Sequence, residues 1–300
     1  MKNNKPLVTV FICTYKKFDY LKEALESLFT QDYPNIELII SDDGSPNFDR
    51  NMIDNLIASA PNSIKEIIII HHEKNLGTVK NLNNLLRECN GDYCIGLSQD
   101  DLFYRESTIS EIVNFFISND ALIITSKRVL FTNNFYDSEE AIPKDKDYRY
   151  LLEDNEKLFS RLCVNNFISG ASTYHAKKLF EKYGYFDEEY ILLEDQPKYL
   201  ELVRKKVKIY FFNEITKYYR LGGISTNKTI NHVLLDDAKK AIEKEVFPYV
   251  DKCDYRLYRV SKFNYEYYNF YKRLSSLIVV KYLDAIVYKL LIQSGILKLK

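Results

Sequence analysis

Two adjacent carboxylates, Asp100 and Asp101, follow an apolar run that has the composition of a buried strand, residues 93–97. A buried strand seldom ends in paired acids unless a cation lies nearby. Carboxylate oxygens are hard ligands that suit Mg²⁺ or Mn²⁺, and such ions commonly bind phosphate oxygens as well. The pair therefore predicts a metal site that serves a phosphorylated ligand.

A second acidic pair, Asp42 and Asp43, follows the apolar run 36–40 and precedes a glycine and a serine. Two such pairs at strand ends within the first hundred residues indicate one site for a nucleotide and a metal. The alternative is that each pair caps a helix or lies in a solvated turn. That alternative explains either pair alone better than it explains both pairs in this order.

The composition is that of a globular chain and limits what the protein can bind. Of its 300 residues 46% are apolar, enough to bury a sizeable core, and the formal net charge is zero. A neutral chain is not expected to bind nucleic acid through a broad basic surface. Five scattered cysteines, an N-terminus without a signal-peptide pattern and the lack of a run of about 18 apolar residues together predict a cytoplasmic protein.

Strand-like and helix-like segments alternate through the first hundred residues. The β-rich segments are 7–13, 36–40, 67–70 and 93–97, and segments with helical spacing lie between them at 18–30, 48–58 and 78–89. This alternation predicts an α/β fold, with a mostly parallel sheet covered by helices on both faces. The carboxyl ends of all four strands then meet at one edge, where ligands bind in open α/β sheets. The polar segments expected at that edge are Thr14-Tyr15, Asp42-Asp43, His71 to Asn75 and Asp100-Asp101.

The second half of the chain alternates less regularly. We expect a helix near 107–118, a strand near 121–126 and a helix near 195–205. The charged stretch 136–150 is predicted to be a surface loop. From about residue 231 the chain is predicted to be helical.

Several motifs, in their order and spacing, resemble those of the family 2 glycosyltransferases, which have the GT-A fold. The matching segments are VTVFICTY at 8–15, LFTQDY at 28–33, ELIISDDGS at 37–45, NLG at 75–77, GDY at 91–93 and LSQDD at 97–101. The match is dense over 7–110 and continues to about residue 225. It implies a GT-A catalytic domain at 1–228, with a nucleotide-binding half at 1–104 and an acceptor-binding half at 105–228, and then a helical C-terminal region at 229–300.

The resemblance implies roles at the nucleotide end of the site. Thr14 and Tyr15 would line the nucleobase pocket, with the Tyr15 ring packed on the base. Asp43 would accept a hydrogen bond from a uracil-like edge, and Asp42 would support it. The family contacts the base or the diphosphate at three further positions, which in this sequence are Asn75, Gly77 and Lys80.

The family's metal motif, Asp-x-Asp in many members, corresponds here to Gln99-Asp100-Asp101, so its first acid is replaced by a glutamine. The replacement makes Asp101 the expected ligand of Mn²⁺ or Mg²⁺ and places Asp100 near the ribose. One protein carboxylate together with phosphate oxygens is a normal arrangement for Mg²⁺.

The pair Glu194-Asp195 resembles the family's Glu-Asp motif at the start of a helix. Asp195 would be the general base that takes the acceptor hydroxyl's proton in an inverting transfer, and Glu194 is the next candidate. The alternative is that Asp195 only caps the helix, since acids favour first turns. Arg220, followed by Ser225, resembles the late segment that closes on the diphosphate. Arg220 would neutralise leaving-group charge, or else form an ordinary surface ion pair.

The end of the chain is basic and rich in aromatic residues. From Asp254 to Lys300 nine lysines and arginines face three acids, and the apolar stretch 277–296 is interrupted by charged residues. This pattern is typical of an amphipathic helical region that lies on an anionic membrane surface. The alternatives are packing on the catalytic domain and a dimer contact.

We therefore predict an inverting glycosyltransferase that uses Mn²⁺ or Mg²⁺. It would move a hexosyl or N-acetylhexosaminyl group from a nucleotide sugar, with UDP as the expected carrier, to a hydroxyl of a glycan or lipid-linked oligosaccharide in bacterial-type surface polysaccharide synthesis. The alternative is an inactive GT-A-like nucleotide-binding partner subunit, and the intact base candidate at Asp195 favours the enzyme. The inner face of the cell membrane and a second copy of the chain are further candidate partners.

Overall fold

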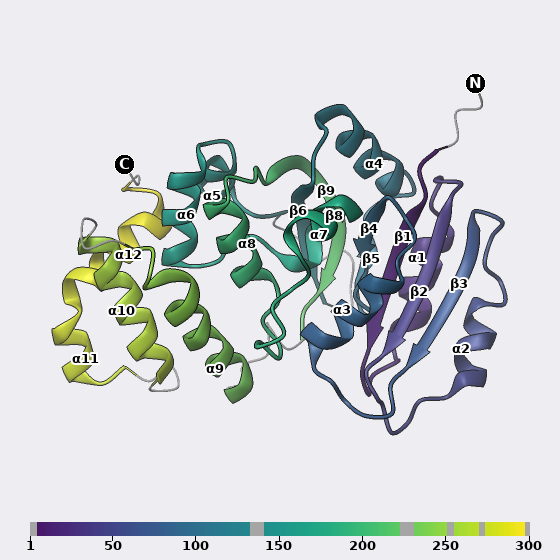
Figure 1. The fold of residues 1–300 in the computed structure, drawn as a ribbon, viewed down its shortest axis with the longest axis horizontal. Coiled ribbons are helices and arrows are strands. Elements are labelled where there is room, and N and C mark those ends of the chain that lie inside the picture. The colour runs from purple at the N-terminus through teal and green to yellow at the C-terminus, as the bar shows by residue number, and fades with distance from the viewer. Residues whose placement is uncertain (1–4, 133–140, 223–230, 251–254, 270–273, 298–300) are drawn as a thin grey trace. The chain divides into compact units, whose positions relative to one another are not determined.

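The computed structural model describes residues 5–132, 141–222, 231–250, 255–269 and 274–297. The chain forms two compact units, each assembled from separate stretches of sequence (Figure 1). The first unit comprises Met1–Ile142, Gly170–Tyr185 and Ile209–Gly223, and the second comprises Pro143–Ser169, Phe186–Lys208 and Ile224–Lys300.

The first unit is built on one sheet. Its strands are β1 Val8–Thr14, β2 Ile36–Asp42, β3 Ile64–His71, β4 Tyr93–Gly96, β5 Leu102–Phe103, β6 Ile123–Phe131, β7 Ala141–Ile142, β8 Thr173–Ala176 and β9 Tyr210–Arg220. Its helices are α1 Leu21–Phe29, α2 Arg50–Ile57, α3 Thr78–Glu88, α4 Thr108–Asn119 and α7 Lys177–Tyr183, with the short 3₁₀ segment η3 Gly170–Ser172. The strand order is β3-β2-β1-β4-β8-β6-β9-β5, and β7 pairs with β6.

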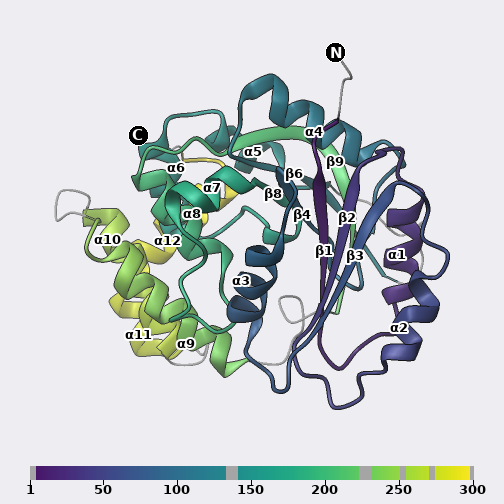
Figure 2. The same ribbon diagram turned by 45° about the vertical axis from the view of Figure 1, so that its right-hand side comes forward.

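The first four strands pair in parallel, which confirms the α/β prediction. Figure 2 shows α3 on one face of these strands and α1 and α2 on the other. The register pairs Thr14 with Asp42 and Asp42 with His71, so the polar ends of three strands lie side by side at the carboxyl edge. Apolar side chains on both faces of β1 and β2 bury these strands and fix that register.

A buried carboxylate organises the opposite edge of the sheet. Glu37 is fully buried and accepts hydrogen bonds from Thr9 Oγ1 (2.5 Å), from the Asn90 backbone amide (3.0 Å) and from Asn90 Nδ2 (2.7 Å). The amide of Gly91 donates to Thr9 Oγ1 at 2.9 Å. These bonds fix the turn that leads into β4. They therefore also set the direction of β4 and the position of the metal motif that follows it.

The stretch 136–150 is not a surface loop where the structure describes it, so that prediction was wrong. It contains β7, the helix α5 Asp145–Tyr148 and the 3₁₀ segment η2 Arg149–Leu151. Tyr150 is buried, with the Arg161 guanidinium 5.8 Å from its ring centroid. The prediction failed because the composition of this stretch is mostly charged, which gives no sign that Tyr150 packs inward. Residues 136–140 lie outside the described residues.

The second unit is helical. Besides α5 and η2, it contains α6 Asn155–Val164, α8 Asp195–Arg204, α9 His232–Ala241, the π-helical segment η4 Ile242–Val246, α10 Tyr255–Asn269, α11 Ser276–Lys281 and α12 Leu283–Ser294. Helix α10 packs against α6, α9 and α12. The helical character expected beyond residue 231 is therefore confirmed wherever the chain is described. Within those residues, no helix is long and apolar enough to cross a membrane.

We expect Gly91→Ala to destabilise the first unit by about 1–3 kcal/mol, because an added methyl group overpacks a tight site. A Cβ at this position would overlap the Thr9 backbone nitrogen and lie 2.9 Å from the Val8 carbonyl carbon. Urea unfolding measures the effect, and Asp92→Ala, a change at the exposed neighbouring residue, is the control. Equal stability of Gly91→Ala and wild type would contradict this packing.

Candidate functional site

Asp42 is a buried hub at the carboxyl edge of the sheet. Its Oδ2 accepts hydrogen bonds from Thr14 Oγ1 (2.9 Å) and Ser45 Oγ (2.6 Å). Its Oδ1 accepts one from the Ser45 amide (2.7 Å) and lies 2.9 Å from His71 Nδ1. Four bonds occupy the lone-pair positions of a carboxylate. Asp42 therefore ties β1, β2, β3 and the following turn together, and Thr14, also buried, uses its hydroxyl inside this network.

Asp43 holds a second loop against the first. Its Oδ1 accepts a hydrogen bond from the Leu76 amide (2.7 Å), and its Oδ2 accepts bonds from Asn75 Nδ2 (2.9 Å) and the Gly77 amide (3.1 Å). Burial raises the pKa of Asp43, and the two backbone amides partly oppose that shift. Oδ1 has a single partner among these bonds, so one lone pair there remains for a ligand donor.

Two glycines permit the close approach of these loops. Gly44 has φ +72°, and a Cβ there would lie 2.7 Å from the Asn75 backbone nitrogen. Gly77 precedes α3 with φ 89°. The first turn of α3, which includes the exposed Lys80, therefore starts beside the Asp43 loop. Helix N-termini attract phosphate groups through free amides and the helix dipole.

Tyr15 lies just beyond the end of β1. Its side chain is 37% exposed, and Lys16 Nζ lies 4.6 Å from its ring centroid. The Lys16 backbone has φ 62°, and its amide donates to Ser45 Oγ at 2.7 Å. The Asp42 network therefore also fixes the turn that presents the Tyr15 ring.

The metal motif places two buried oxygens in one turn. Asp101 is buried, and its Oδ1 accepts a hydrogen bond from the Arg220 amide at 3.0 Å. Asp101 Oδ2 and Gln99 Oε1 are both buried and have no hydrogen-bond partner in the described part of the chain. Burial raises the pKa of Asp101 to about 6. Unpaired buried oxygens of this kind fit a hard divalent cation.

The described residues contain no cluster of three or more His, Cys, Asp or Glu side chains that could hold a metal by themselves. A cation bound at Asp101 would therefore take most of its ligands from water or from a bound ligand. Mg²⁺ is commonly held in this way, through one or two carboxylates and substrate phosphates.

Arg220 ends β9 beside the metal motif. Its Nε donates to the Asp100 carbonyl oxygen (3.0 Å), and its Nη2 donates to Glu23 Oε2 (2.6 Å). The guanidinium lies 3.7 Å from the ring centroid of Tyr20, and the residue is buried. Burial raises the pKa of Asp100, whereas the charges of Arg220 and Lys17 lower it. Arg220 is thus no exposed surface residue, and it contacts both acids of the motif.

A second cation on β9 has no signature in the sequence. Lys217 is fully buried, and its Nζ donates to the Gly96 carbonyl oxygen. Burial lowers its pKa to about 8, while the nearby charge of Asp101 raises it. No local pattern marks Lys217 or Glu23, because their partners lie more than a hundred residues away in sequence.

The other predicted residues, Glu194 and Asp195, belong to the second unit and stand at the start of α8. Asp195 Oδ1 accepts a hydrogen bond from the Gln196 amide (2.6 Å), and its Oδ2 accepts one from Asn166 Nδ2 (3.2 Å). Burial, followed by the charge of Asp195, raises the pKa of Glu194.

The structure thus joins the predicted residues of the first unit in two clusters. One contains Thr14, Asp42, Asp43, Asn75 and Gly77, with Tyr15 and Lys80 beside it. The other contains Gln99, Asp100, Asp101 and Arg220. Ser225 lies outside the described residues.

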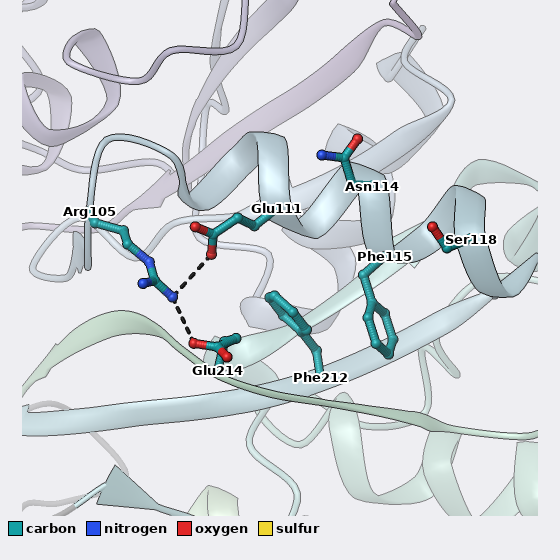
Figure 3. A pocket seen from close by; sticks show the side chains of 7 residues that line it. All are labelled: Arg105, Glu111, Asn114, Phe115, Ser118, Phe212 and Glu214. Atoms are coloured by element: carbon teal, nitrogen blue, oxygen red, sulfur yellow. Dashed lines mark hydrogen bonds and ion pairs between the residues drawn. The ribbon is translucent and has the colours of Figure 1, made fainter.

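A hollow lies between α4 and β9 (Figure 3). Arg105 forms ion pairs there with Glu111 (3.1 Å) and Glu214 (2.8 Å). Helix α4 packs at the amino end of β4, where Tyr93 stacks on Phe116. The lining residues include none of the predicted ones; they are Arg105, Glu111, Asn114, Phe115, Ser118, Phe212 and Glu214.

Solved structures with low sequence identity share this fold. Staphylococcus aureus TarS 1–349 in complex with UDP-GlcNAc has a TM-score of 0.63 at 16% identity, over 95% of this chain and 81% of that chain. The mannosyltransferase PcManGT of Pyrobaculum calidifontis, in complex with GDP-Man and Mn²⁺, has a TM-score of 0.61 at 12% identity, over 98% and 86% of the two chains. These likenesses confirm the predicted GT-A-like fold.

Sequence comparisons give the family. An uncharacterized glycosyltransferase of Haemophilus influenzae is 27% identical over 257 residues, which cover 83% of this chain and 76% of that protein. The putative teichuronic acid biosynthesis glycosyltransferase TuaG of Bacillus subtilis is 27% identical over 231 residues, 76% of this chain and 85% of that protein. The model of Glycosyl transferase family 2 matches residues 9–184, more than half of the chain. The chain is therefore a glycosyltransferase and belongs to glycosyl transferase family 2.

Proposed function

We propose that the chain is an inverting, metal-dependent glycosyltransferase that moves a hexosyl or N-acetylhexosaminyl group from a UDP-sugar to a hydroxyl of a glycan or lipid-linked acceptor. The proposal rests on two buried oxygens, Gln99 Oε1 and Asp101 Oδ2, which have no hydrogen-bond partner among the residues that the structure describes. The Arg220 guanidinium donates to the carbonyl oxygen of the intervening Asp100. The relative named for teichuronic acid biosynthesis and the neighbour solved with UDP-GlcNAc support surface polysaccharide synthesis and a UDP donor.

The nucleotide is proposed to bind along the carboxyl edge of the sheet. The base packs on the exposed Tyr15 ring and donates a hydrogen bond to Asp43 Oδ1. The diphosphate lies toward the start of α3, near Gly77 and Lys80. Thr14, Asp42 and Asn75 support the nucleotide site indirectly, because their polar groups hold its two loops in place.

Asp101 Oδ2 and Gln99 Oε1 are proposed to hold a Mn²⁺ or Mg²⁺ ion, which would take its further ligands from the donor's phosphates and water. When bound, the ion stabilises negative charge on the departing diphosphate. Asp100 faces the ribose. Arg220 anchors Asp101 through its amide and contributes positive charge beside the motif.

Asp195 is proposed to accept the proton of the acceptor hydroxyl as the glycosidic bond forms. Asn166 fixes the orientation of its Oδ2. Burial raises the pKa of Glu194 and so favours its neutral form, which makes Glu194 the second candidate for the base. General-base catalysis requires a carboxylate within hydrogen-bond reach of the hydroxyl that it deprotonates.

The C-terminal helices are proposed to bind an anionic membrane surface. Large apolar side chains on and beside α11 and α12 are 46–81% exposed, and they are Leu274, Leu277, Val280, Leu283, Val287, Leu290 and Ile296. Exposed charges on these helices are paired, Lys281 with Glu266 (2.8 Å) and Asp284 with Arg259 (2.6 Å). These exposed apolar side chains, from here on called the apolar stripe, therefore support membrane binding more strongly than the basic residues do.

One cation expected on that surface faces inward instead. Lys289 donates to Asn264 Oδ1 at 2.6 Å, and burial lowers its pKa to about 8. Several other charged residues of the predicted basic region lie outside the described residues, namely Asp254, Lys272, Arg273, Lys298 and Lys300.

The proposal predicts release of UDP from at least one UDP-sugar in a panel of nucleotide sugars with Mn²⁺ and a lipid-linked acceptor fraction. Chelation with EDTA should stop the release, and added Mn²⁺ should restore it, because without the ion nothing at the Asp101 site stabilises the charge of the departing diphosphate. An assay of free nucleoside diphosphate measures both effects. Equal rates in EDTA would contradict metal dependence, and nucleotide binding without any release would favour the inactive partner subunit.

Asp195→Asn should keep its affinity for UDP and lose turnover by roughly a hundred-fold or more, because the amide cannot accept a proton at neutral pH. Steady-state kinetics and calorimetry of UDP binding check the two parts. The matched control is Asp236→Asn, a change at an exposed acid of the same unit. Normal turnover of Asp195→Asn would move the base to Glu194.

Replacing Leu277, Leu283 and Leu290 together by serine should weaken binding to phosphatidylglycerol vesicles at least several-fold, since apolar burial supplies much of an interfacial helix's affinity. Vesicle co-sedimentation at low and high salt measures it, and UDP affinity serves as the folding control. If the wild-type chain ignores anionic vesicles at low salt, the membrane proposal fails. The stripe would then be tested as a dimer contact by light scattering.

A further inference from the structure

A buried carboxylate on α9 holds the segment that leads into Glu194-Asp195. Asp237 Oδ2 accepts hydrogen bonds from three consecutive backbone amides, those of Ile191 (2.9 Å), Leu192 (2.6 Å) and Leu193 (3.1 Å). Consecutive amides that converge on one anion form a nest, a common anion-binding arrangement. Asp237 is buried, so water does not replace these bonds readily.

Two lysines extend the same contact along the chain. Lys240 Nζ donates to the Glu189 carbonyl oxygen, and Lys244 Nζ forms ion pairs with Asp187 (2.8 Å) and Glu189 (2.9 Å). The spacing of Asp237, Lys240 and Lys244 places all three on one side of the α9–η4 helix. Together they attach the segment 187–193 to that helix at several successive points.

This attachment matters because the segment has no regular structure of its own. Residues 184–194 form turns and bends between α7 and α8, without helix or strand hydrogen bonds to define their path. Leu193 directly precedes Glu194, so the amides bound by Asp237 set the direction in which the chain enters α8. A small shift of a positioned catalytic group is enough to slow a reaction strongly.

We propose that Asp237 is a positioning residue for transfer, which acts through Asp195 by fixing residues 191–193. The inference rests on the proposed role of Asp195 as the base. It also gives the helices after residue 230 a part in catalysis, although they lie beyond the family match at 9–184. The charge is the essential property, because a neutral amide side chain binds three backbone donors less strongly than a carboxylate does.

The test is a double-mutant cycle of Asp237→Asn with Asp195→Asn. We expect Asp237→Asn to lower kcat at least ten-fold, to change the donor KM less than two-fold and to leave UDP affinity unchanged. The number of UDP sites per chain, from calorimetry, corrects kcat for any unfolded fraction. The double variant should be no slower than Asp195→Asn alone, because Asp237 acts only through a base that is already lost.

Control variants keep the outcome readable. Asp236→Asn, a change at the exposed neighbour on α9, should leave kcat unchanged. If Asp237→Asn does not fold, Lys244→Gln is the substitute, because it removes the ion pairs of the same helix with Asp187 and Glu189. It should lower kcat by about two- to ten-fold, and it should cause no further loss of kcat when combined with Asp195→Asn.

Three results have distinct meanings. Wild-type kcat in Asp237→Asn, with Asp195→Asn impaired, overturns the positioning role and leaves the proposed function standing. Losses that multiply in the double variant also overturn it, because they would indicate a separate structural effect. Normal turnover of Asp195→Asn removes the base assignment, and the inference about Asp237 is overturned with it.

Discussion

The carboxyl edge of the first unit depends on one saturated carboxylate. Asp42 is buried, and its four bonds join the ends of β1, β2 and β3 to the turn that follows β2. Removing a partner from such a group would leave buried polar atoms unpaired, at a cost of about 1–3 kcal/mol each. All the acceptor positions of Asp42 are used, and the neighbouring Asp43 binds the loop before α3. Ser45, which binds Asp42, also accepts a hydrogen bond from the Lys16 amide and so fixes the turn at Tyr15. The loops of the proposed nucleotide site are thus joined by hydrogen bonds that need no ligand.

The metal motif is arranged in the opposite way, with bonding capacity left open. Asp101 uses one oxygen to receive the Arg220 amide, and its other oxygen has no partner among the described residues. Positive charges from Arg220 and Lys217 lie close by, which limits the repulsion between Asp100 and Asp101. A buried acid with a raised pKa and an unused oxygen is costly to fold, and such sites are common where a protein binds a cation or performs catalysis. The structural and the chemical carboxylates therefore differ in how many of their bonds are already made.

The sequence predicted the parallel half of the sheet because continuous apolar strands and spaced helices have strong local signatures. The convergence of Asp42, His71 and Asn75 followed from the handedness of the crossovers. Contacts between distant segments could not be predicted in this way: Arg220 binds Glu23 and Lys217 binds Gly96, and no local pattern encodes either pair. The inward direction of Lys289 and the burial of Tyr150 could not be predicted for a related reason, since both residues lie in stretches whose composition is typical of a protein surface. The spacing of Asp237, Lys240 and Lys244 was visible, but its meaning required knowing which segment α9 contacts.

A divalent ion and the donor's diphosphate are proposed to bind together at the Gln99-Asp101 turn. Anomalous diffraction at the manganese edge, from crystals grown with UDP and Mn²⁺, tests it most directly. We expect one strong manganese peak within coordinating distance of Asp101 Oδ2 and beside the diphosphate, with the uracil ring on Tyr15. UDP bound at this edge with manganese elsewhere, or manganese at Asp101 with UDP bound at another surface, would contradict it.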